Sequence, residues 1–274
     1  MQTSSPRLSE SRAAELHQHN TASAKRAIAF VTIYALSAVG AVSLAASLES
    51  AWKYLACLPL YLLSAASLHG ISLFTHEGVH GALSKNVHWN RWLSMVCALP
   101  VLQNFSAYRV LHLKHHRHLG DEGDPDHYKN YSRWTWVVFA MHWGRLLIGY
   151  PAYLIMIPIL GFRQGTRSER HWILLEIGLL IATVALLVWV APPFRVVLHA
   201  WLLPMLLINT MVNIRGMSQH TLLEHETDPV KGTRTICTHP IVAYLALQDQ
   251  AAGGEPRPET RAAGTSAPSH RHAD

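Results

Sequence analysis

Two groups of closely spaced histidines are the strongest candidates for chemistry in this chain. The first is His76 and His80, in the stretch THEGVH, and the second is His112, His115 and His116, in HLKHH. On a helix, residues four positions apart share a face, so each group can aim two side chains at one ion, with His115 beside the second pair. Imidazole nitrogen suits iron, zinc and copper. Five histidines exceed the needs of one four-coordinate zinc ion, so the pattern predicts a two-metal site.

The stretch HEGVH also matches the HExxH pattern, in which two histidines bind zinc and the glutamate is a general base. An intramembrane metalloprotease of this kind needs a further ligand, typically an aspartate from a later span. Glu176 is the only carboxylate in the two later apolar segments, and a protease site leaves HLKHH unexplained, so we disfavour it. The isolated histidines are interpreted as packed or interfacial residues, namely His69, His88, His142, His171 and His199.

The composition indicates a membrane protein. Half of the 274 residues are hydrophobic and 15% are charged, whereas about a quarter of the residues are charged in an ordinary soluble domain. Cys57, Cys97 and Cys237 are not closely paired, which argues against a disulfide framework or a zinc knuckle. The net charge of +6 comes with no basic helix or aromatic-basic module, so we expect no nucleic-acid partner.

Four apolar runs are long enough to cross a hydrocarbon core of about 30 Å. They cover residues 27–48, 54–75, 177–194 (extended to about 173 as a span) and 196–214. The stretch 146–162 is weaker, because it contains Gly149, Pro151, Pro158 and Gly161, and we expect it to be re-entrant or interfacial.

Lysine and arginine orient these spans. Four precede the first span, eleven lie between spans two and three, six follow span four, and each short connection has one. The positive-inside rule then places both termini and all the histidine groups on the cytoplasmic side. We therefore expect an all-α integral membrane protein of four transmembrane helices plus a cytoplasmic histidine-rich helical cap. That cap would comprise residues 76–170 and 215–247 of a domain covering 25–247, preceded by a disordered lead-in, residues 1–24.

From about Leu68 to Tyr244 the chain resembles the membrane fatty acid desaturases, a superfamily that includes carotenoid hydroxylases and ketolases. The stretches that carry the resemblance are HEGVHG, YRVLHLKHHRHLGDEGDPD and NIRGMSQHTLLEHETDPVKGTRTI. The first two match the family's HxxxH and HxxHH boxes. IRGMSQH is similar to the family's arginine-to-histidine stretch after the last span, which implies His220 as a further ligand, although Gln219 stands where the family usually has glutamate.

The resemblance implies the remaining parts of the site and its reaction. His118, Asp124, Asp126 and Arg215 would orient the ligands or neighbouring cations. Two irons would activate O2 to remove hydrogen from an acyl chain of a lipid or an acyl thioester. Electrons would come from a ferredoxin, a flavodoxin or a cytochrome b5-like donor.

The family's third box, (H/Q)xxHH, is missing after TRTI. His225 and His239 are not spaced to replace it, and residues 248–274 form a tail that we expect to be disordered. One interpretation is a natural variant with a reduced site. The other, which we favour, is a frameshift near residue 248, because the family pattern stops abruptly there.

The sequence leaves three functions open. Acyl desaturation is the leading hypothesis. A carotenoid or lipid hydroxylase or ketolase would use the same histidine boxes, because one oxidant can either remove a second hydrogen or deliver a hydroxyl group. A catalytically silent membrane protein that binds lipid or one metal is the alternative outside the enzymes.

Overall fold

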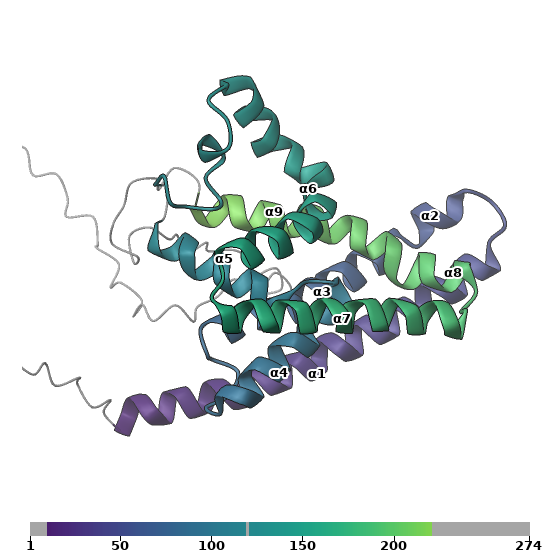
Figure 1. Ribbon diagram of the computed structural model, residues 1–274. Helices are drawn as coiled ribbons and strands as arrows, with labels where there is room; N and C mark the ends of the chain where they lie inside the picture. Colours follow the sequence, from purple (N-terminus) through teal and green to yellow (C-terminus); the bar gives the residue numbers. More distant parts are fainter. Residues whose placement is uncertain (1–9, 119–120, 221–274) are drawn as a thin grey trace, which may run out of the picture.

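The computed structural model describes residues 10–118 and 121–220, and for 10–24 and 217–220 it describes the backbone alone. Within these residues the chain is made of helices joined by turns, with no strand (Figure 1). The expected all-α class is therefore confirmed for this part of the chain. The tail from residue 248 and most of the expected segment 215–247 lie outside the described residues.

Among the described residues, seven helices have twelve residues or more. They are α1 (Glu10–Ser47), α3 (Leu58–Val79), α4 (Val87–Ala98), α5 (Phe105–Arg117), α6 (Thr135–Gln164), α7 (Arg167–Val190) and α9 (Leu203–His220). The short elements between them are α2 (Trp52–Ala56), η1 (Leu99–Val101), η2 (Tyr128–Asn130), α8 (Phe194–Val197) and the π-helical η3 (Leu198–Leu202). Helix α1 begins inside the segment 1–24 that we expected to be disordered, because alanine, glutamate and leucine there are good helix formers.

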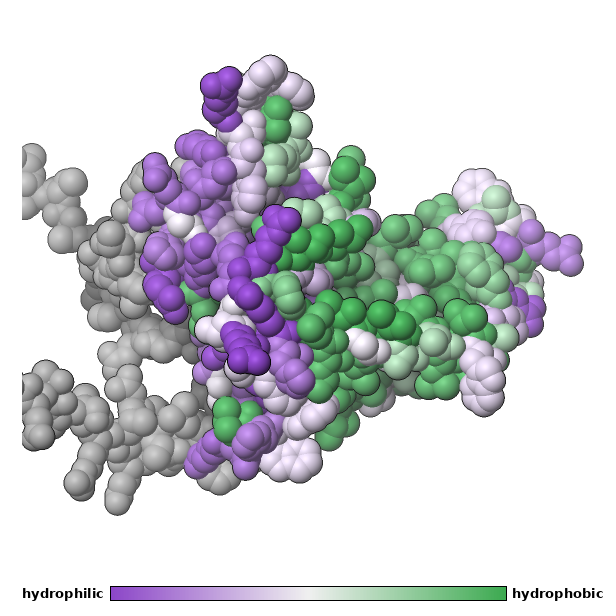
Figure 2. Space-filling model, viewed as in Figure 1, coloured by the Kyte–Doolittle hydropathy of each residue, from purple (hydrophilic) through white to green (hydrophobic). Residues whose placement is uncertain are grey.

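Five helices are long and apolar enough to cross a membrane. They are Lys25–Ser47 within α1, α3, α6, α7 and the continuous stretch Phe194–Gly216. Four of them overlap the predicted spans. The fifth, α6, contains the stretch 146–162, so the described chain has one more apolar helix than the four-span prediction counts. Figure 2 shows apolar residues covering one half of the visible face, over α7 and α8, and polar residues gathered at the other end, near α5.

Helix α6 contains two prolines, and α9 bonds to its backbone next to the first of them, Pro151. Pro151 has no N–H to donate and its ring crowds the preceding turn. The Oδ1 of Asn209 accepts a hydrogen bond from the Tyr150 N–H at 2.6 Å, and its Nδ2 donates to the Leu146 carbonyl at 2.5 Å. A neighbouring helix thus satisfies the backbone groups that the proline disturbs, as apolar surroundings require. The breakers that predicted a re-entrant segment are accommodated within one helix.

Residues 87–117 form a helical hairpin between α3 and the later helices. Its first arm, α4, packs on α3, and its second arm, α5, packs on α6 and α7. The tip is η1, where Val101 packs against Ala65 and Leu68 of α3 and Ile208 of α9. The hairpin matters for function because its second arm carries the HLKHH histidines.

Candidate metal centre

The last turn of α3 presents the first two histidines. His76 and His80 are four residues apart, and their rings lie 4.9 Å from one another between centroids. The helix ends directly afterwards, where Gly81 adopts a φ of +73° and donates its N–H to the carbonyl of Gly78. Glycine adopts this left-handed conformation at helix ends without steric cost. The chain therefore turns away just past His80, so both imidazoles lie at the open end of α3.

Buried polar groups at the first turn of α5 hold this helix in place, and α5 carries the HLKHH histidines. Asn104 caps α5 by accepting the Ala107 N–H at 2.9 Å, and it donates to the Ile173 carbonyl of α7 at 3.0 Å. The carboxylate of Glu176 accepts the Ser106 N–H at 3.0 Å and the Ser106 hydroxyl at 2.5 Å. A negative charge at a helix N-terminus is stabilising. These bonds attach the start of α5 to α7.

Close backbone packing holds the middle of α5 against α6. A side chain on Gly161 would place its Cβ 2.7 Å from both the Cα and the Cβ of Ala107. No real side chain fits in that space, so glycine is required for this approach of the two helices. With the capping groups of α7, this contact fixes where α5 places its histidines.

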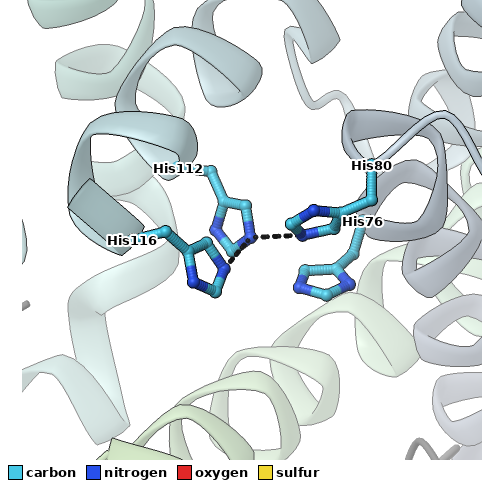
Figure 3. A group of neighbouring side chains, drawn as sticks. All are labelled: His76, His80, His112 and His116. Atoms are coloured by element: carbon cyan, nitrogen blue, oxygen red, sulfur yellow. Dashed lines mark hydrogen bonds between the residues drawn. The ribbon is translucent and has the colours of Figure 1, made fainter. Parts of the chain in front are cut away.

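Four histidines from the two helices face one another (Figure 3). They are His76 and His80 of α3 and His112 and His116 of α5, and each offers one nitrogen within 4.8 Å of the nitrogens of the others. The Nε2 atom of His112 lies 3.3 Å from that of His80 and 2.9 Å from that of His116. The two helical pairs therefore come together at one place in the structure.

The spacing of these nitrogens fits a bound metal ion. In a tetrahedral site with metal–nitrogen distances near 2.1 Å, neighbouring ligand atoms are about 3.4 Å apart. The two nitrogen separations around His112 are 3.3 Å and 2.9 Å, and all four nitrogens lie within 4.8 Å of one another. Within the described residues this group holds four imidazoles and no carboxylate, a ligand set that suits iron, zinc or copper rather than magnesium or calcium.

The surroundings of His112 keep its ring neutral. Burial lowers its pKa well below the ordinary value, and the nearby His76, His116, His80 and His115 lower it further, because a second positive charge among them is unfavourable. A neutral imidazole has the lone pair that a metal needs. The site therefore presents a ligand that needs no deprotonation near neutral pH.

His115 lies beside this group and has a carboxylate partner. Its Nδ1 atom is 2.8 Å from Oδ1 of Asp124, and both side chains are buried. Burial alone would lower the pKa of His115, but the hydrogen bond from Asp124 and the charges of Asp126 and Asp124 outweigh it, so the pKa is raised. Bonding at Nδ1 leaves Nε2 as the nitrogen able to bind a metal, the arrangement commonly seen for metal-ligating histidines.

A family model described as fatty acid desaturase matches residues 50–250, most of the chain. The chain belongs to the fatty acid desaturase family. It is 29% identical over 140 residues to the sn-1 acyl-lipid omega-3 desaturase (ferredoxin) of Synechocystis sp., which is 48% of this chain and 36% of that protein. It is 26% identical over 108 residues to the sn-1 oleoyl-lipid 12-desaturase of Arthrospira platensis, 34% of this chain and 31% of the relative. The chain thus matches about a third of the length of each relative.

The remaining predicted residues of this desaturase-family site lie around α5. Asp126 is 65% exposed at its side chain, and its Oδ2 is 3.8 Å from Nδ1 of His115. His118 ends α5, where its N–H donates to the carbonyls of Lys114 and His115. It is not in the four-histidine group. Both residues contact the turn beside the site rather than the four nitrogens.

Helix α9 brings Arg215 toward the same region. Burial raises the pKa of Tyr108, and the positive charge of Arg215 opposes that rise. The Tyr108 ring in turn stacks on His112, with centroids 5.0 Å apart. His220 is the last residue of α9, and its side chain lies outside the described part of the structure.

Sequence reasoning missed the groups that position α5. Asn104 and Ser106 are ordinary polar residues in an apolar stretch, and nothing in their spacing marks them. Glu176 did give a signal, because it is the only carboxylate in the third and fourth apolar runs. A buried carboxylate in such a helix requires donors, and here they come from Ser106.

Proposed function

We propose that this chain is a membrane-bound non-heme di-iron oxidoreductase that desaturates fatty acyl chains of lipids in the presence of O2. The observation that carries the proposal is the group of four imidazoles contributed by the ends of α3 and α5, in a chain of the fatty acid desaturase family. The apolar helices around it supply the environment in which an acyl chain dissolves.

His76, His80, His112 and His116 would hold one iron. His115, oriented by Asp124, and His220 would contribute to a second iron next to it. Bound iron would supply the activation of O2 that an unactivated methylene needs. The protein's own part is to keep His112 neutral and to hold the four imidazole nitrogens close enough to share one ion.

The reaction balances with an external reductant. One O2, two electrons and two protons, with two hydrogens from adjacent methylenes, give a double bond and two waters. Ferredoxin is the donor that we propose, with a flavodoxin or a cytochrome b5-like protein as the other donors of that class. The support is the name of the Synechocystis relative, and both relatives' names support an acyl lipid as substrate rather than an acyl thioester.

The missing third histidine box bears directly on activity. We propose that the segment after Leu247 is read out of frame, so that the gene in its original frame encodes an HxxHH box that completes the second iron's ligands. Translating the two other frames downstream of Leu247 tests this without any expression. A box in one of them supports the proposal, and the lack of one in both contradicts it.

The second candidate function is that of a catalytically silent membrane protein that binds lipid or one metal. Its support is the four-histidine group, which suffices for one ion. Metal analysis of the purified version with the restored frame separates the two. Two irons per chain support the enzyme, whereas one or none favours a protein that binds lipid or a single metal.

Lipid analysis of expressing cells tests the reaction itself. The chain as written and a version with the restored frame are expressed with a ferredoxin system, and acyl chains are profiled by mass spectrometry. We expect new double bonds from the restored version, and their loss in His112→Ala of that version. Hydroxylated or ketolated lipids instead of unsaturated ones would assign the chain to the hydroxylase and ketolase branch.

A further inference from the structure

Helix α4 shows its apolar face outward. Trp89, Leu93 and Val96, spaced at helical intervals along one side, are 63%, 42% and 58% exposed. The opposite face is buried and comprises Asn90, Ser94, Met95 and Ala98. An amphipathic helix at a water-facing surface has the reverse arrangement, with its apolar stripe toward the core.

The buried polar side chains of α4 are satisfied internally. Asn90 donates from Nδ2 to the Gly78 carbonyl at 2.8 Å, and its Oδ1 accepts the N–H groups of Leu83 and Ser84. The Ser94 hydroxyl donates to the Asn90 carbonyl at 2.6 Å. The polar groups of this helix therefore point into the protein and need no solvent. Buried polar side chains with internal partners, together with an outward apolar face, are what an apolar medium favours.

The hairpin reaches deep along the spanning helices. At its tip, Val101 contacts Leu68, which lies eleven residues before the end of α3 at Val79. Those eleven residues correspond to about 16 Å of helix, roughly half of a bilayer's hydrocarbon core. The indole N–H of Trp201, in η3, donates to the Pro100 carbonyl at 2.8 Å. The tip is thus level with the interior of the apolar helices and not with their ends.

The backbone of the hairpin meets the condition for immersion in lipid. Non-helical backbone is tolerated at membrane depth only where protein covers it. The tip is largely covered: Val101 of η1 and Asn104 are each 2% exposed, Leu102 and Gln103 are half-buried, and the carbonyl of Val101 accepts a hydrogen bond from the Tyr150 hydroxyl. The arm that is exposed, α4, is helical, so its own hydrogen bonds satisfy its backbone.

Charged residues are absent from the tip of the hairpin and lie at the start of α4. The seventeen residues from Trp92 to Tyr108 contain no charged side chain. Lys85 and Arg91 lie at the opposite end, before or within the first turns of α4, together with Trp89. Tryptophan and basic residues favour the membrane–water boundary, and uncharged apolar residues favour its interior.

We propose that residues 87–104, which are α4 and the tip, form the membrane-inserted part of a re-entrant hairpin, and that Trp89, Leu93 and Val96 contact lipid acyl chains. Its partner is the bilayer leaflet on the histidine side of the protein. This arrangement replaces, for these residues, the water-exposed cap expected from the sequence. The proposed hairpin requires only that the protein lies in a membrane, and it is independent of the proposed reaction.

Nitroxide labels on single cysteines test the proposal in the full-length protein. Val96→Cys and Leu93→Cys are made in a background with the three native cysteines replaced, and the protein is reconstituted in vesicles of phosphatidylcholine and phosphatidylglycerol. Relaxation by oxygen, which concentrates in lipid, is compared with relaxation by a water-soluble nickel chelate. Lys85→Cys is the control for water exposure, and Val39→Cys, on the exposed side of α1, is the control for lipid exposure.

We expect the oxygen-to-nickel ratio at positions 96 and 93 to match that at Val39 and to be several times the ratio at Lys85. Ratios like that of Lys85 at both positions would overturn the proposal, because α4 would then face water. Labels that neither reagent reaches would also overturn it, since the face would be covered by protein, such as a second copy of the chain. Two labelled positions one helical turn apart keep the test valid if one variant folds poorly.

Discussion

Nδ1 of His115 lies 2.8 Å from Oδ1 of Asp124. This bond distinguishes His115 from the group of His76, His80, His112 and His116, whose nitrogens lie close together. The carboxylate is 3% exposed and also accepts the N–H of Asp126 at 2.8 Å. HLKHH thus contains two kinds of histidine. His112 and His116 face α3, whereas His115 is oriented by a turn that follows its own helix.

The bond between His115 and Asp124 predicts a pH-dependent effect of Asp124→Asn in metal-free protein. The pKa of His115 is raised in the folded state, so its stabilisation is fully present below the unfolded-state pKa of about 6.5 and is lost as pH rises through the folded-state pKa. The variant should lose about 2 kcal/mol at pH 6 and less at pH 8. Thermal unfolding in detergent with a chelator measures this. A larger loss at pH 8 than at pH 6 would contradict the assignment.

The contact between Gly161 and Ala107 predicts that α5 and α6 tolerate no side chain there. Gly161→Val must push the helices apart, because its Cβ would lie 2.7 Å from Ala107. We expect a loss of about 1–3 kcal/mol in unfolding free energy, together with weaker metal binding because α5 moves. The matched control is Gly144→Ala in the same helix, where no atom lies within 4 Å of the added Cβ. Equal effects of the two substitutions would exclude the packing explanation.

The bonds from Asn209 to α6 predict coupling with Pro151. Asn209→Leu leaves the Tyr150 N–H and the Leu146 carbonyl without this partner, so we expect a loss of about 1–3 kcal/mol. In a Pro151→Ala background α6 can form its own backbone hydrogen bonds. There Asn209→Leu should cause a smaller loss of stability. A double-mutant cycle measures the difference. Additive effects would show that Asn209 does not act on the break at Pro151.

The carboxylate of Glu176 predicts a graded response at the start of α5. Glu176→Leu removes the acceptor for the Ser106 N–H and hydroxyl, so the buried donors should reduce stability by about 3 kcal/mol. Glu176→Gln keeps one acceptor oxygen and should lose less. Unfolding of the two purified variants provides the comparison. A leucine variant as stable as the glutamine variant would mean that these bonds contribute little.

Much of the fold was predictable, because bilayer-length apolar runs carry their own signal. The spans at 27–48, 54–75 and 196–214 correspond to α1, α3 and the stretch ending in α9. Prolines in 146–162 indicated a break, but the partner that accommodates Pro151 is Asn209, which lies 58 residues later in the sequence. A side chain that bonds to the backbone of a helix distant in sequence produces no pattern in the sequence around that helix. The full length of α6 was therefore not predicted.

The site was predictable to the extent that helical spacing determines direction. The i and i+4 pairs of His76 with His80 and of His112 with His116 were correctly placed on shared faces. That the two faces meet depends on the hairpin tip, on Gly161 and on Glu176. Those are tertiary contacts, which the local spacing of histidines does not reveal.

Metal content of the purified protein tests the central claim most directly. The wild-type chain, purified from cells grown with iron, is compared with His112→Ala and with His88→Ala, an exposed histidine outside the group. We predict bound iron in the wild type and in His88→Ala, with absorption edges typical of imidazole ligation, and its loss in His112→Ala. Iron retained in His112→Ala at the wild-type level, or a wild-type chain that binds none, would contradict the account.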